Sequence, residues 1–173
     1  MKVTLFMAVS ANGMIADEHY GEDFLSHANW ETFSGLVKKY KNFVVGRKTL
    51  EAVKNWGTDY GFDDFTEATK VILSRGLTYE LPAGYISATS PQSALTVLEN
   101  KGFTNVLVSG GASVNTAFAK AGLLDEIILN IEPVIVAGGL SIFDRGIFLL
   151  RLELLKTTKI NDSIVQLYYR VIK

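Results

Sequence analysis

Three short segments combine glycine, hydroxyl and basic residues in a way that suits the binding of phosphate groups. The first, residues 108–114, runs from an apolar stretch into Gly110 and Gly111 and then directly into a helical pattern. Glycine lets a backbone approach a ligand closely, and the unpaired N–H groups at a helix start attract anions. No third glycine follows at the spacing of the GxGxxG fingerprint. A strand-to-helix turn without a ligand would have the same pattern, so that alternative stays open.

The two other segments add positive charge to the same strand-to-turn pattern. The second contains a glycine, two basic residues and a hydroxyl, namely Gly46, Arg47, Lys48 and Thr49, and the third contains Ser74 and Arg75. Arg47 can form a bidentate pair with phosphate oxygens, although both basic residues could instead simply solvate a turn. Because ligands of open α/β sheets bind at the carboxyl ends of the strands, three such segments together predict a dinucleotide site. The extra arginines favour the 2′-phosphate of NADP.

Acidic residues gather where a substrate would meet this dinucleotide. They are Asp17, Glu18, Glu22, Asp23 and Glu31. A C=N bond that accepts a hydride gains from a nearby proton donor, but a solvated acidic loop is the commoner explanation for any one of them. The two histidines, His19 and His27, are too few for most zinc sites, and the absence of cysteine excludes thiolate chemistry. We therefore predict no metal site.

The elements that position these residues alternate between strand and helix. Strand patterns cover residues 3–9, 42–45, 70–73, 85–88, 105–109 and 126–132, and helical patterns cover residues 30–41, 49–55, 91–101 and 114–121. Two extended runs, residues 149–159 and 164–172, close the chain. This order predicts an α/β fold with a mostly parallel sheet and an antiparallel hairpin at one edge. The apolar edge of the hairpin invites pairing with a second chain, so we expect a homodimer.

Composition limits the classes of function. The 173 residues suit a single domain spanning residues 1–173, and 48% of them are hydrophobic, which supports a core. A net charge of −1 and the lack of a long basic run disfavour nucleic acid as a partner. No apolar run approaches the length of a membrane span. We expect a cytoplasmic protein with a small-molecule substrate.

Four segments resemble, in order, signatures of the dihydrofolate-reductase-like superfamily. They are residues 9–16, 44–51, 108–118 and a closing stretch within 122–143, and together they resemble most closely the branch that contains the reductase domain of riboflavin biosynthesis, the C-terminal domain of the bifunctional deaminase-reductase. The resemblance implies a three-layer α/β/α fold, a homodimer and NADPH as cofactor. It also implies hydride transfer to a pteridine- or pyrimidine-type substrate, as in a 5-amino-6-(5-phosphoribosylamino)uracil reductase.

The resemblance further implies which residues hold the cofactor. Ala8 and Ile15 would line the nicotinamide pocket. The phosphates would be held by Gly46, Arg47, Lys48 and Thr49, and the adenosine 2′-phosphate would lie near Ser74 and Arg75. The pyrophosphate would be wrapped by Gly110, Gly111, Ala112, Ser113 and Val114.

The substrate side departs from the folate enzymes. They carry an acid on the first helix, four residues before an aromatic residue, but counting back from Phe33 gives Asn29, which cannot ionise. An ion pair with a pteridine ring is lost unless Glu31 or a loop acid replaces it. Asn130 falls where the folate enzymes carry a substrate-contacting threonine. Asn29, Glu31 and Asn130 are thus the catalytic candidates. Folate reduction, or a dinucleotide-binding module without turnover, are the alternative functions.

Overall fold

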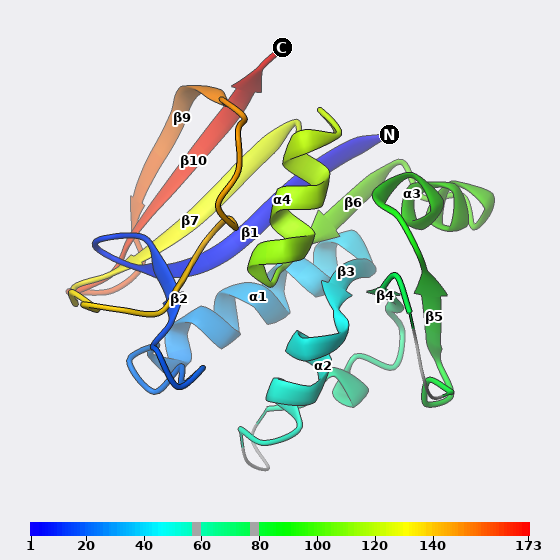
Figure 1. Ribbon diagram of the computed structural model, residues 1–173, viewed down its shortest axis with the longest axis horizontal. Coiled ribbons are helices and arrows are strands. Elements are labelled where there is room, and N and C mark those ends of the chain that lie inside the picture. Colours follow the sequence, from blue (N-terminus) through cyan, green and yellow to red (C-terminus); the bar gives the residue numbers. More distant parts are fainter. Residues whose placement is uncertain (57–59, 77–79) are drawn as a thin grey trace.

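An eight-stranded sheet forms the centre of the computed structural model, which describes residues 1–56, 60–76 and 80–173. Its strands are β1 (Lys2–Ser10), β3 (Asn42–Gly46), β4 (Thr69–Leu73), β5 (Tyr85–Ala88), β6 (Asn105–Val108), β7 (Glu126–Glu132), β9 (Arg151–Lys159) and β10 (Val165–Ile172). They are arranged in the order β5-β4-β3-β6-β1-β7-β10-β9 (Figure 1). The first six strands in this order run parallel to one another. The next strand, β10, runs antiparallel to both of its neighbours, β7 and β9. The predicted α/β architecture is confirmed.

Helices cover both faces of the sheet. They are α1 (His27–Tyr40), α2 (Arg47–Val53), α3 (Pro91–Asn100) and α4 (Ala112–Lys120), with a short 3₁₀ turn, η1, at Phe62–Asp64. Figure 1 shows α4 in front of the sheet and α1 behind it. None of the helices in the described part of the chain is long and apolar enough to cross a membrane.

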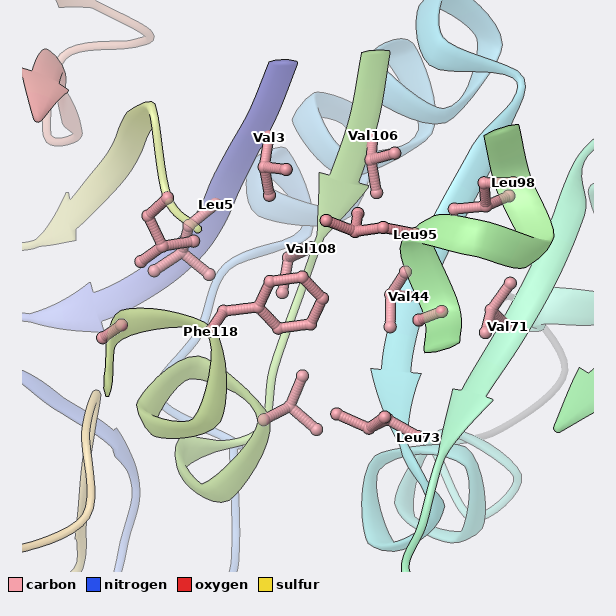
Figure 2. Packing of buried hydrophobic residues seen from close by; sticks show 14 of the residues in the cluster. Val3, Leu5, Val44, Val71, Leu73, Leu95, Leu98, Val106, Val108 and Phe118 are labelled. Atoms are coloured by element: carbon pink, nitrogen blue, oxygen red, sulfur yellow. The ribbon is translucent and has the colours of Figure 1, made fainter. Parts of the chain in front are cut away.

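The alternation of side chains along each strand divides the core into two layers. Val3 and Leu5 of β1 contact α3 and α4, in a cluster that includes Phe118 and Leu98 (Figure 2). Phe6, one residue further along, lies in the opposite cluster with apolar residues of α1 and α2, namely Phe33, Val37, Leu50 and Val53. Because successive strand residues face opposite sides, a continuous apolar run such as that of β1 fits a strand buried on both faces.

The starts of three helices differ from the sequence prediction, and one of them is α4, which begins at Ala112 rather than at residue 114. Helix α1 begins at His27 rather than at Trp30, since Ser26 precedes it in extended conformation as N-cap. Helix α2 begins at Arg47 rather than at residue 49, directly after Gly46. Apolar periodicity missed the first turns of α1 and α2 because their residues are polar. Helix α3 is capped by Ser90, whose hydroxyl accepts a hydrogen bond from the Ser93 N–H.

A second, two-stranded sheet was not predicted. It pairs β2 (Met14–Ala16) with β8 (Leu140–Ser141), and neither strand is long enough to show a period. The pairing brings the chain after β1 against the loop after β7. Gly139 makes this close approach possible, because a Cβ there would lie 2.1 Å from the carbonyl oxygen of Ala16.

Candidate active site

The carboxyl ends of β3, β6 and β1 meet at the double glycine that follows β6. The Gly46 N–H donates a hydrogen bond to the Gly110 carbonyl at 2.8 Å, which ties the end of β3 to the segment after β6. Gly110 has a φ of 86°, which favours glycine, and a Cβ there would lie 3.0 Å from the sulfur of Met7. Gly111 is different, because the nearest atom to an added Cβ would be the Thr49 hydroxyl oxygen at 3.4 Å. Glycines thus form a floor where these strands end.

A pocket of about 440 Å³ opens beside these strand ends, and Gly111 is the glycine that lines it. Its lining comes from the end of β1, β2, the loop before α1, α1 itself, α2, the stretch after α2, and the segment that follows β6: Phe6, Met7, Ala8, Ile15, Glu22, Asp23, Leu25, Ser26, Asn29, Trp30, Phe33, Thr49, Val53, Asn55, Trp56, Tyr60, Phe62, Ser109 and Gly111. Seven residues singled out in the sequence are therefore brought together here: Ala8, Ile15, Glu22, Asp23, Asn29, Thr49 and Gly111. A pocket with mostly apolar walls and a few polar groups is the usual form of a small-molecule site.

The other predicted phosphate-binding residues lie outside this lining. Arg47 forms an ion pair with Glu51, one turn further along α2, in which one guanidinium nitrogen donates to both carboxylate oxygens at 2.7 and 2.9 Å. Lys48 is exposed and lies over the ring of Tyr20. Seven further residues predicted to hold the cofactor lie outside the lining. Four of them are buried, namely Gly46, Gly110, Ala112 and Val114, while Ser74 is half-buried and Arg75 and Ser113 are exposed.

The first turn of α4 keeps its backbone donors available to a ligand. Gly111 is the N-cap residue of this nine-residue helix and has no side chain to cap it. Ala112 and Ser113 follow directly, so their N–H groups have no capping side chain as a partner. N–H groups at such a position, with the helix dipole behind them, favour an anion such as a pyrophosphate.

Asn29 is held by a buried carboxylate that sequence reasoning missed. One oxygen of Glu132, at the end of β7, accepts hydrogen bonds from the Ser26 N–H at 2.8 Å, from the Ser26 hydroxyl at 2.7 Å, and from the Asn29 amide. The Asn29 carbonyl oxygen in turn accepts from the Asn130 amide at 3.0 Å. Gln166 of β10 donates to the Asn130 carbonyl oxygen at 2.9 Å. A chain of hydrogen bonds thus runs from Glu132 through both asparagines to β10.

The three catalytic candidates differ in whether they line the pocket and could contact a ligand there. Both amide hydrogens of Asn29 are used, one on Glu132 and one on the Ser26 carbonyl. Asn130 is fully buried and does not line the pocket. Glu31 is exposed on α1 and lies outside the lining as well. Asn29 is the only one of the three candidates at the pocket wall.

Aromatic rings make up one wall of the pocket. Trp30 of α1 packs its ring against Trp56, Tyr60 and Phe62, with ring centroids 6.2, 5.4 and 6.2 Å away. The Tyr60 hydroxyl lies 3.0 Å from Nδ1 of His27. Such a wall stacks against flat rings. Trp30 therefore serves both as packing and as pocket lining.

The lining includes one ionisable group with a strongly raised pKa, the carboxyl of Glu22. Asp17 folds the loop that carries it, because one Asp17 carboxylate oxygen accepts hydrogen bonds from the N–H groups of His19 and Gly21. A Cβ on Gly21 would lie 2.8 Å from the Asp17 carboxylate, so a larger residue there would push this carboxylate aside. Burial raises the pKa of Glu22 from its ordinary value of 4.5 to about 7.

The raised pKa of Glu22 makes stability depend on pH in a defined direction. Between about pH 7 and pH 4.5 the folded state holds a proton that the unfolded state releases, so lowering the pH through this window stabilises the fold. Glu22→Gln removes this ionisation. We expect the variant to exceed the wild type in free energy of unfolding by up to about 3 kcal/mol at about pH 8, with the difference shrinking toward about pH 5.

Urea unfolding at the two pH values measures this difference. The control is Glu18→Gln, on the same loop, because the Glu18 side chain is 75% exposed. If Glu22→Gln kept the pH dependence of the wild type, the burial of an ionisable Glu22 carboxyl would be refuted.

Across residues 1–56, 60–76 and 80–173, His, Asp and Glu form no group of three or more that could hold a metal ion.

Sheet order, helix placement and the glycine floor together define a dihydrofolate-reductase-like α/β fold. The sequence matches the RibD C-terminal domain family over residues 1–166, and the chain belongs to that family. It is 28% identical over 176 residues to the uncharacterized protein YwjB of Bacillus subtilis (strain 168), which covers 97% of each chain. Family membership supports an oxidoreductase role.

Solved structures confirm the fold. A putative riboflavin biosynthesis protein from Shewanella sp. PV-4 aligns with a TM-score of 0.81 at 23% identity, over 100% of both chains. Dihydrofolate reductase from Enterococcus faecalis, in complex with NADP(H), aligns with a TM-score of 0.72 at 16% identity, over 99% of this chain and 97% of that one. The superfamily and branch that the four sequence segments indicated are both confirmed.

Proposed function

We propose that the protein is an NADPH-dependent reductase that passes a hydride to a pteridine- or pyrimidine-type substrate. The observation that carries the proposal is one pocket that joins Gly111, in the segment after β6, to an aromatic wall on α1. The floor suits a dinucleotide and the wall suits a flat ring. A reduced nicotinamide supplies the hydride when it is bound. The chain's own part is to bind both rings, align them and exclude water.

Each group of residues has a distinct task in this proposal. Ala8, Ile15 and Thr49 leave room for the nicotinamide beside Gly111, since small or apolar side chains line that part of the pocket. The first turn of α4 provides N–H groups for the pyrophosphate. Arg75, exposed at the end of β4, supplies charge for the adenosine 2′-phosphate.

Calorimetric titration of the purified protein with NADPH and with NADH tests the cofactor assignment. We expect NADPH to bind about tenfold more tightly, because a guanidinium–phosphate contact contributes on the order of 1.4 kcal/mol at an exposed site. Arg75→Ala should remove most of this preference and leave the affinity for NADH unchanged. Binding of neither dinucleotide, or equal binding of both, would refute the proposal as stated.

We further propose that two copies of the chain associate through β9. This edge strand is exposed over residues 151–157 and carries Leu152, Leu154 and Leu155, which are 39%, 54% and 37% exposed. An unpaired, apolar edge can join the same edge of a second copy about a two-fold axis. Light scattering should give twice the chain mass of 19.0 kDa, and Leu154→Lys should give the monomer mass. A wild-type mass of one chain at micromolar concentration would contradict a dimer.

A further inference from the structure

The charged groups that line the pocket restrict the kind of substrate more narrowly than membership of the family does. Among the described residues that line it, the ionisable ones are Glu22, Asp23 and Tyr60, and none is a lysine or arginine. A phosphate group placed against this lining would meet two carboxyl groups and no cation. Since buried or half-buried anions need a paired charge or several donors, a phosphorylated substrate is disfavoured at this wall.

Among the described residues that line the pocket, Glu22 carries the carboxyl that is half-buried and free to accept a ligand. Glu132 lies outside the lining and is already bonded to Ser26 and Asn29. Asp23 is exposed. No hydrogen bond or ion pair joins the Glu22 side chain to another residue within the described part of the chain, and the surroundings of its carboxyl are sufficiently apolar to raise its pKa.

A carboxyl without a partner, beside aromatic rings, suits a ligand of a particular chemical kind. The rings stack on the face of a flat heterocycle, and the carboxyl accepts hydrogen bonds from N–H or amino groups on the heterocycle's edge. An uncharged or cationic donor edge removes the cost of burying the carboxylate, whereas an acceptor or an anion would add to it. The recognition chemistry is therefore that of an amino-substituted nitrogen heterocycle.

We infer that the pocket takes an unphosphorylated, flat nitrogen heterocycle whose ring N–H or amino group donates to Glu22. The inference rests on the proposed reductase function and narrows its substrate. It differs from what the riboflavin-type resemblance implies, a pyrimidine that carries a ribose phosphate. It also places the recognising carboxyl on the loop before α1 rather than on that helix, where Asn29 stands.

Calorimetry with two probes tests the inference, on the full chain with and without NADPH. The first probe is 2,4-diaminopyrimidine, which has a donor edge and no phosphate, and the second is uridine 5′-monophosphate. We expect the first to bind more tightly than the second, and Glu22→Gln to weaken its binding by about tenfold or more, the effect of losing one charge-assisted hydrogen bond. Glu18→Gln, on the exposed part of the same loop, should bind it as the wild type does.

Several results would overturn the inference without touching the cofactor assignment. They are binding of uridine 5′-monophosphate at least as tight as that of diaminopyrimidine, no binding of diaminopyrimidine, or an unchanged affinity in Glu22→Gln. Because glutamine has the shape of glutamate, the variant should fold, and circular dichroism confirms that it does. Glu22→Asp provides a second variant, which keeps the charge and should keep part of the affinity. Failure of the proposed function appears separately, as absence of NADPH binding.

Discussion

Replacing Asn29 with aspartate is expected to destabilise the protein by about 3 kcal/mol at neutral pH. The Asn29 amide donates to a Glu132 oxygen, and Glu132 is only 4% exposed. The substitution removes the donor and puts a second carboxylate against the first in a buried place, so one of the two must keep a proton. The loss should be complete above the raised pKa of this pair and should vanish below about pH 4, where the unfolded carboxyls also hold protons. Urea unfolding as a function of pH measures it.

A second substitution shows whether charge is the cause. In the double variant Asn29→Asp with Glu132→Gln, the amide and the carboxylate exchange places, and a donor faces an acceptor again. We expect the double variant to regain at least half of the lost stability. If Asn29→Asp were as stable as the wild type, or if the double variant were no better than the single one, the Glu132 network would not explain the amide at position 29.

Replacing Gly111 with alanine is expected to weaken NADPH binding by about ten- to a hundredfold, equivalent to about 1.4 to 2.8 kcal/mol. Gly111 lines the pocket, and an added methyl group would meet only the Thr49 hydroxyl oxygen, at 3.4 Å. The folded protein can therefore accommodate the methyl group, but the methyl group would occupy space that the dinucleotide needs. Calorimetric titration measures the affinity, and thermal unfolding shows whether the variant is folded.

Gly35→Ala is the matched control for this variant. Gly35 lies in α1, is exposed and has no atom within 4 Å of an added Cβ. The control should leave NADPH affinity unchanged and raise stability slightly, because alanine favours a helix. Wild-type affinity in Gly111→Ala would mean that the dinucleotide does not approach the glycine floor.

The strand-end segments of the sequence indicate the fold and the floor of the site correctly. Gly46 and Gly110 are 64 residues apart, yet both follow short apolar runs, and parallel strands bring such ends to one edge. That logic depends only on local patterns and on the topology of parallel sheets. It predicts the edge of the sheet where the proposed cofactor site lies, without any knowledge of side-chain contacts.

The substrate side depends on contacts that local patterns do not encode. The polar residues of β7 are Glu126, Asn130 and Glu132, whose even spacing puts them on one face, and the register pairs Ser10 with Glu132. This even spacing was the signal for a buried polar network, but only the fold shows that α1 covers that face. The spacing of Arg47 and Glu51 is that of a helical ion pair and was equally readable. Glu22 lies in a stretch without a period, so its burial could not be foreseen.

Energy transfer from tryptophan to bound nicotinamide tests the central claim most directly. The chain has two tryptophans, and both Trp30 and Trp56 line the pocket. Exciting tryptophan while titrating NADPH should give saturable emission from the reduced nicotinamide, with a weaker response to NADH and to the Gly111→Ala variant. No saturable emission with either dinucleotide up to about 1 mM would contradict the assignment of this pocket to a nicotinamide reductase.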